Sequence, residues 1–303
     1  MPLPTPHLEK LTSALENEKL PTSDRPRLEA TIARYQQWIS SIRSITTTGP
    51  GAIRPLVALL QDYKLHVDVD VIFNSPDDFL YRQKGQLKLD NSIIEEFLPH
   101  LIEKASSPAL GEEMVIGPNS CFSAVFFTSN LNHPGTGGGL GVRSKAQDFA
   151  VSRKLFLKSS YQQNFSSSET HETFLAYVAA ECKTNLDKTM FQEACATAHD
   201  VKTAVSGAKY FLLCEWLDMT PLSTTGTDID EVLVLRKAKR LNSNVRSRYG
   251  SAAGRSRERE NYIQFLSQNP FCVEVFERLI NHISRALRNE DPDEADVLGR
   301  GYF

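Results

Sequence analysis

Nearly continuous apolar segments in the middle of the chain constrain the fold most strongly. Residues 174–183 (FLAYVAAECK) and 209–217 (KYFLLCEWL) have the composition of strands buried on both faces. Residues 186–206 lie between them, and their apolar side chains recur at helical spacing. Upstream, residues 148–158 (DFAVSRKLFLK) are a strand candidate, and residues 112–129 are rich in β-forming side chains. This order of strands and helix predicts an α/β domain with a mixed sheet.

The N-terminal third is predicted to be mainly helical. Ser23 or Asp24 could cap a helix with Pro26 in its first turn, and apolar residues then follow at spacings of three and four. Two further helices are expected over residues 51–64 and 91–105, although Pro99 should kink or shorten the second. Residues 66–72 (HVDVDVI) alternate between polar and apolar side chains, which predicts a short strand.

The net charge of −3 conceals an uneven distribution of charge along the chain of 303 residues. Residues 236–259 carry nine Lys or Arg and one Glu, whereas residues 289–296 (NEDPDEAD) form an acidic tail. Arg side chains match the geometry of phosphate, so the basic block is a candidate for DNA binding, with a solvated surface as the alternative. The candidate DNA-binding residues are Arg236, Lys237, Lys239, Arg240, Arg246, Arg248, Arg255, Arg257 and Arg259.

These patterns divide the chain into three regions. Residues 1–90 form a mainly helical N-terminal region, and residues 91–235 form the α/β core. Residues 236–303 form a basic and helical C-terminal region with the acidic tail.

The strongest chemical signal is Glu181-Cys182-Lys183 at the end of an apolar strand. Side chains two residues apart on a strand share a face, so Glu181 and Lys183 point to the same side. Asp148 begins another apolar strand, and it would join them if the two strands were neighbours. Two carboxylates and the Cys182 carbonyl are suitable ligands for a hard cation such as Mg²⁺. A metal site of this kind, with a lysine beside it, fits phosphodiester hydrolysis.

Other motifs are less specific. Pro76-Asp77 reads better as a turn or helix start, and Asp62-Tyr63-Lys64 falls at a helix end. The Gly-rich loop 133–146 fits neither the P-loop nor the dinucleotide-binding pattern. A surface salt bridge is the competing interpretation of Glu181 and Lys183, and a turn residue is that of Asp148.

At these residues the sequence resembles the PD-(D/E)XK nuclease superfamily. Asp148 matches its metal-binding aspartate, and Glu181 and Lys183 match the E-x-K half of the motif; Gln147 stands where the superfamily most often has Pro. The resemblance implies a restriction-endonuclease-like mixed β-sheet core flanked by helices, with helical additions at both ends. It also implies metal binding by Asp148, Glu181 and Cys182 and an accessory polar residue at Gln192.

The function implied is that of a Mg²⁺-dependent type II restriction endonuclease that cuts double-stranded DNA at a specific sequence. The chain is also similar to the Bpu-type enzymes, which cut an interrupted, asymmetric CCTNAGC site with two unlike subunits. A homodimer or a heterodimer with a related subunit is expected. The alternatives are a non-catalytic nucleic-acid-binding protein and an inactive partner subunit of a nuclease. No apolar stretch approaches the length of a membrane helix, so a cytoplasmic protein without a membrane partner is expected.

Overall fold

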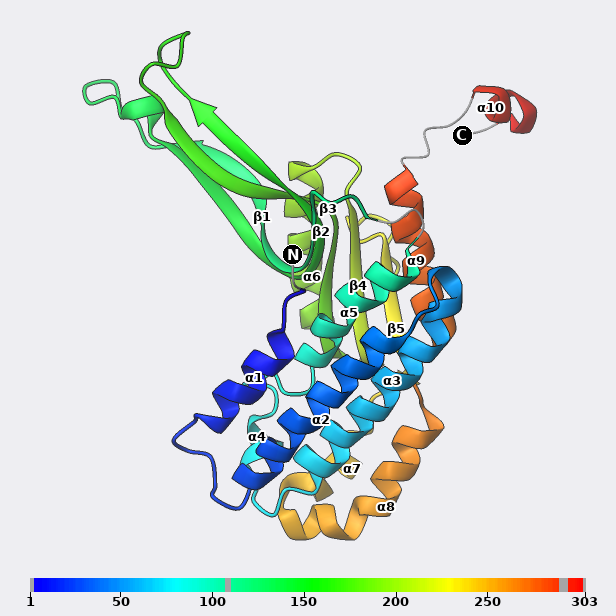
Figure 1. The fold of residues 1–303 in the computed structure, drawn as a ribbon. Coiled ribbons are helices and arrows are strands. Elements are labelled where there is room, and N and C mark those ends of the chain that lie inside the picture. The colour runs from blue at the N-terminus through cyan, green and yellow to red at the C-terminus, as the bar shows by residue number, and fades with distance from the viewer. Residues whose placement is uncertain (1–2, 107–109, 289–293, 302–303) are drawn as a thin grey trace.

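The computed structural model describes residues 3–106, 110–288 and 294–301 and contains the predicted mixed sheet (Figure 1). Its five strands lie in sequence order, with β1, β2 and β3 antiparallel and β3, β4 and β5 parallel. The strands are β1 (Met114–Phe127), β2 (Leu140–Ser159), β3 (Glu169–Leu186), β4 (Lys209–Leu217) and β5 (Glu231–Lys239). The prediction of a restriction-endonuclease-like α/β fold is confirmed.

Helices cover both faces of this sheet. The N-terminal region contains α1 (Pro6–Leu15), α2 (Arg25–Ser44), η1 (Gly49–Ala52), α3 (Ile53–Leu65), η2 (His66–Phe73), α4 (Phe79–Gln83) and α5 (Ser92–Ala105). The remaining helices are η3 (Thr136–Gly138), α6 (Lys188–Ala204), α7 (Ser243–Arg246), η4 (Ser247–Gly250), α8 (Ala252–Gln268), α9 (Val273–Arg288) and α10 (Glu294–Arg300).

Strand alternation produces two cores, one on each face of the sheet. Phe211 and Leu213 of β4 pack with helices α1, α2, α3, α5 and α9. Tyr210 and Leu212 point the other way and pack with α6. Burial of each such side chain stabilises the fold by roughly 1.5–3 kcal/mol, so both faces of the central strands contribute. The predicted burial on both faces is therefore confirmed for β4 and for β3 from Val178 to Cys182, whereas Phe174 and Leu175 are half-buried and Tyr177 is exposed.

The predicted strand at residues 66–72 is wrong, because this segment is the π-helix η2 that continues α3. Val67 and Val71 are four residues apart and both are completely buried. Asp68 pairs with Lys64, also four residues away, at 2.7 Å. The alternating sequence is therefore compatible with a helix. Its acidic side chains pair with residues one turn away along the helix and do not line one face of a strand.

Strand β5 was missed at sequence level, and the region boundary predicted at residue 235 falls inside it. The acidic tail lies only partly within the described residues, since 289–293 are outside them. The loop in the Gly-rich segment is shorter than the predicted residues 133–146, because β2 already begins at Leu140.

Strands β1, β2 and β3, with their two hairpin loops, form an arm that projects from the helical body (Figure 1). The strand β2 pairs with β1 along residues 140–153 and with β3 along residues 149–159. The two stretches overlap at residues 149–153, and hydrogen bonds join the two hairpin loops at the far end of the arm.

Candidate active site

The site forms where β2 and β3 separate. The last residue pair of their ladder is Phe149–Ala180. Beyond this pair, within the sheet, β2 pairs only with β1, and β3 pairs only with β4. Asp148 and Glu181 are the next residues on the two strands. An Asp148 carboxylate oxygen accepts a hydrogen bond from the main-chain N–H of Cys182 at 3.0 Å. The predicted neighbourhood of Asp148 and the E-x-K strand is therefore present in the structure.

Lys183 and Glu181 form an ion pair on the same face of β3. Lys183 Nζ lies 2.6 Å from Glu181 Oε1, and the Tyr210 hydroxyl donates to Glu181 Oε2 at 3.2 Å. Burial by itself lowers the pKa of Lys183, but the hydrogen bond and charge of Glu181 outweigh it, with help from Asp148. The pKa of Lys183 consequently lies above its usual value, and the side chain is a cation at neutral pH.

A third carboxylate reaches the site from α5 and was not predicted. Glu95 is 5% exposed, and its pKa is raised by burial and by the nearby charge of Asp148. Lys88 lies between the two acids, 3.6 Å from Glu95 and 3.7 Å from Asp148. Asn91 donates to Glu95 at 2.8 Å and to the Cys182 carbonyl at 3.0 Å. The only sequence signal for Glu95 was an acid pair inside the apolar run of residues 91–105.

The ligand chemistry of this cluster suits a hard divalent cation. Asp148, Glu181 and Glu95 offer carboxylate oxygens, and the Cys182 carbonyl keeps a second lone pair beside its bond from Asn91. Burial and nearby acids raise the pKa of the Cys182 thiol well above its usual value, which leaves it protonated and unsuited to metal binding. In the part of the chain that the structure describes, no three His, Cys, Asp or Glu side chains are gathered as a ready-made metal site.

Gln192 is exposed on α6. The negative charge of its neighbour Glu193 contributes to the raised pKa of Lys183. An accessory role for Gln192 stays a prediction.

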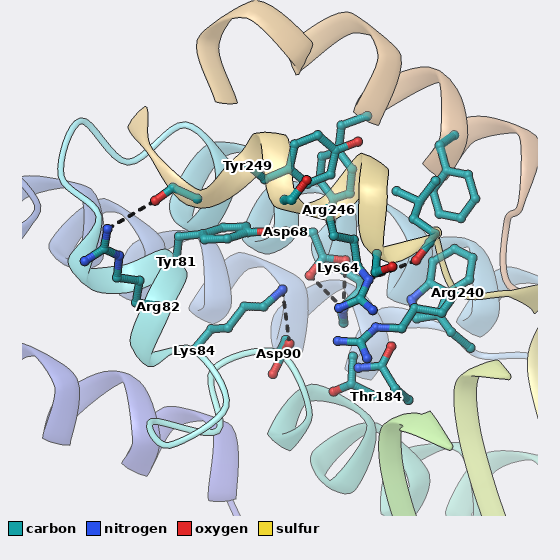
Figure 2. A pocket seen from close by; sticks show the side chains of 18 residues that line it. Lys64, Asp68, Tyr81, Arg82, Lys84, Asp90, Thr184, Arg240, Arg246 and Tyr249 are labelled. Carbon is teal, nitrogen blue, oxygen red and sulfur yellow. Dashed lines mark hydrogen bonds and ion pairs between the residues drawn. The ribbon is translucent and has the colours of Figure 1, made fainter. Parts of the chain in front are cut away.

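A cavity of about 510 Å³ adjoins the strand end that carries the E-x-K residues. Thr184 and Asn185, which follow Lys183 on β3, line it together with Arg240 and Arg246. Figure 2 shows these two arginines near Lys64 and Thr184, with Lys84 directed toward Asp90. Five basic and two acidic side chains line the cavity, which favours anionic ligands.

Two of the predicted DNA-binding residues are buried, which argues against that role for them. Arg236 is 3% exposed, pairs with Glu215 at 3.1 Å and lies over the Phe271 ring. Arg255 is 1% exposed and donates hydrogen bonds to main-chain carbonyls of the segment after η2. Both guanidinium groups therefore form their hydrogen bonds and ion pairs within the protein.

The other seven basic residues of the segment lie at or near the surface. Lys239 and Arg257 are exposed, whereas Lys237 pairs with Glu274 and Arg248 pairs with Glu258. Arg240 pairs with Asp218 at 2.7 Å, Arg246 donates to the Leu241 carbonyl, and Arg259 donates to Asn74.

Comparisons with known proteins concern the family and the fold. The family model described as Bpu10I restriction endonuclease matches residues 86–303, more than half of the chain. A solved structure of the native BbvCI A2B2 tetramer has the same fold, with a TM-score of 0.58 and 19% sequence identity. That match covers 95% of this chain and 98% of the BbvCI chain. No curated protein matches the sequence.

Within the described residues, no helix is both long enough and apolar enough to span a membrane.

Proposed function

The chain belongs to the Bpu10I restriction endonuclease family, and from this membership we propose how its residues cut DNA. It is a type II restriction endonuclease, a site-specific deoxyribonuclease that hydrolyses phosphodiester bonds. The observation that supports the catalytic assignment is the meeting of Asp148 with Glu181 and Lys183 where β2 and β3 separate.

We propose Mg²⁺ as the metal, held by Asp148, Glu181 and the Cys182 carbonyl. Restriction endonucleases generally use divalent metal ions, and the oxygen ligands here match the preference of Mg²⁺. The bound ion would polarise the scissile phosphate and lower the pKa of a water molecule. Glu95 supports this site through its hydrogen bond with Asn91, which also holds the Cys182 carbonyl.

Lys183 is proposed to stabilise charge and orient the attacking water. Because its pKa is raised, it carries a proton at neutral pH and cannot accept one from the water. It donates hydrogen bonds instead, toward the phosphate or the water, and Glu181 fixes its position. In-line attack would leave a 5′-phosphate and a 3′-hydroxyl.

The basic C-terminal segment is proposed to contact the DNA through its surface residues. Arg240 and Arg246 are the most favourable candidates, because they line the cavity beside Thr184 and Asn185. Lys237, Lys239, Arg248, Arg257 and Arg259 are the other candidates, and Arg236 and Arg255 are left out because they are buried.

We further propose that the chain acts together with a related, unlike subunit. The support is the BbvCI structure, an A2B2 tetramer with two copies of each of two subunits. We also propose that the enzyme acts in the cytoplasm, where it would meet its double-stranded DNA substrate.

The test is cleavage of plasmid and phage DNA in Mg²⁺ or EDTA, by the chain alone and with the neighbouring gene product. Lys183→Met is compared with Lys188→Met, a matched change of an exposed lysine at the start of α6. We expect discrete Mg²⁺-dependent fragments that persist in Lys188→Met. Loss of a charge-stabilising group lowers cleavage by roughly 10²–10³-fold in Lys183→Met, with binding retained.

Three outcomes would contradict parts of this proposal. Cleavage that persists in Lys183→Met would remove the assignment of that residue. DNA binding without cleavage, even with a second subunit, would favour the non-catalytic alternative. Cleavage by the chain alone would remove the requirement for an unlike subunit.

A further inference from the structure

Lys88 brings a second lysine to the candidate active site, from the segment between α4 and α5 rather than from the sheet. Its ammonium nitrogen lies 3.7 Å from Asp148 Oδ1 and 3.6 Å from Glu95 Oε1. The other oxygen of Asp148, Oδ2, accepts a hydrogen bond from the main-chain N–H of Cys182. Lys88 therefore faces the Asp148 oxygen that the bond to β3 does not use, which is also the oxygen most available to a divalent cation.

The pairing of Lys88 with these two acids is loose. Both distances are too long for a hydrogen bond, so the attraction is one of charge alone. The Lys88 side chain is also 46% exposed, and water can reach its ammonium group. Lys183 differs in both respects, because it lies 2.6 Å from Glu181 and is 25% exposed. Lys183 is thus fixed in the site, whereas Lys88 can leave the acids without breaking a hydrogen bond to them.

The main chain of Lys88 has a conformation that residues with side chains rarely adopt. Its φ angle is 51°, in the left-handed region. The Lys88 N–H donates to the Gly85 carbonyl at 3.2 Å, and the Lys88 carbonyl accepts from the Ser92 N–H and hydroxyl at 3.2 and 2.6 Å. Glycine or asparagine would adopt this φ angle at lower cost. A lysine held here indicates that its side chain, and not the turn alone, is needed at this place.

The charge of Lys88 compensates the acids beside it. Burial and the charge of Asp148 raise the pKa of Glu95, and the ammonium of Lys88 counteracts them. A divalent cation bound by Asp148 would supply the same compensation, and an ammonium already beside that carboxylate opposes its entry by charge repulsion. We propose that Lys88 is an exchangeable counter-ion that competes with the divalent metal for Asp148 and Glu95. This inference rests on the proposed metal-dependent function and adds a residue that controls how readily the site takes up its metal.

The test is Mn²⁺ binding to the full chain without DNA, followed by the electron paramagnetic resonance signal of free Mn²⁺. Mn²⁺ is the probe because it prefers the same oxygen ligands as Mg²⁺. Lys88→Met removes the charge, Lys88→Gly removes it in a residue that accepts the positive φ angle, and Lys88→Arg keeps it. Lys154→Met is the matched control, because Lys154 is 45% exposed and pairs with Glu172 on the arm at 2.8 Å. Far-ultraviolet circular dichroism checks that each variant is folded.

Because water screens the half-exposed Lys88, its removal should lower the dissociation constant for Mn²⁺ by roughly three- to tenfold in Lys88→Met and Lys88→Gly. Lys88→Arg and Lys154→Met should bind Mn²⁺ as the unaltered chain does. An equal or weaker affinity in the two uncharged variants would overturn the inference. Asp148→Asn then separates this failure from that of the proposed function. If Asp148→Asn loses Mn²⁺ binding, the proposed metal site stands without a role for Lys88, whereas normal binding by Asp148→Asn would remove the metal site as well.

Discussion

Arg255 and Arg257 lie two residues apart in the basic segment, yet the structure gives them different roles. Arg255 is 1% exposed, whereas Arg257 is exposed on α8. The guanidinium of Arg255 donates five hydrogen bonds of 2.7–3.2 Å, to the carbonyls of Phe73, Ser75, Asp77 and Tyr249 and to the Asp78 carboxylate. Arg255→Met keeps most of the apolar volume but leaves these acceptors without their donor. Each unsatisfied buried acceptor costs about 1–3 kcal/mol, and water can reach some of them, so we expect a loss of about 4 kcal/mol.

Urea denaturation measured by tryptophan fluorescence tests this value. Arg257→Met is the control and should change the free energy of unfolding by less than about 0.5 kcal/mol. DNA binding should be affected more by Arg257→Met than by Arg255→Met, the reverse of the order expected for stability. Loss of one phosphate contact lowers the salt dependence of binding by about one, which we expect for Arg257→Met and not for Arg255→Met. The reasoning would be refuted if Arg255→Met kept its stability and lost salt dependence.

Three further predictions concern buried acids. Glu95→Gln should raise the Mg²⁺ concentration needed for half-maximal cleavage, because it removes a negative charge beside Asp148; an unchanged Mg²⁺ titration would exclude that role. Glu215→Leu should destabilise the protein by about 3–5 kcal/mol, because Lys64 and Arg236 lose their shared buried partner; a urea midpoint equal to that of the unaltered chain would contradict this. Glu96 has its pKa raised from 4.5 to about 7, mainly by burial, so its contribution to stability is full below pH 4.5 and is lost as the pH rises to 7. The free energy of unfolding of Glu96→Gln should therefore increase relative to the unaltered chain from pH 4.5 to 7, and a constant difference over that range would refute the assignment.

Features that depend on local sequence could be predicted. The apolar runs of β4 and of β3 from Val178 onward reflect burial on both faces, and this burial does not depend on which helices provide it. The E-x-K spacing fixes Glu181 and Lys183 on one face of β3 through strand geometry alone. The position of Asp148 required one further assumption, that its strand pairs with β3, and the ladder satisfies it.

Features that depend on partners far along the chain could not be predicted. Arg236 and Arg255 look like their exposed neighbours in sequence, but their acceptors come from other elements, such as Glu215 on β4 and Phe73 at the end of η2. Strand β5 was hidden by the same basic composition, since Arg236, Lys237 and Lys239 in its second half obscured the short apolar run in its first half. Local charge cannot distinguish a buried guanidinium from one that faces solvent.

The two adjacent acids of α5 show why the helical N-terminal region matters for the active site. Glu95 faces the cluster, and Asn91, one turn earlier, holds the Cys182 carbonyl. Glu96 points elsewhere and accepts hydrogen bonds from the main-chain N–H groups of His7 and Leu8 and from the Tyr35 hydroxyl. A rotation of α5 that moved Glu95 out of the site would also pull Glu96 away from α1 and α2. The N-terminal helices therefore set the orientation of the one active-site carboxylate that does not come from the sheet.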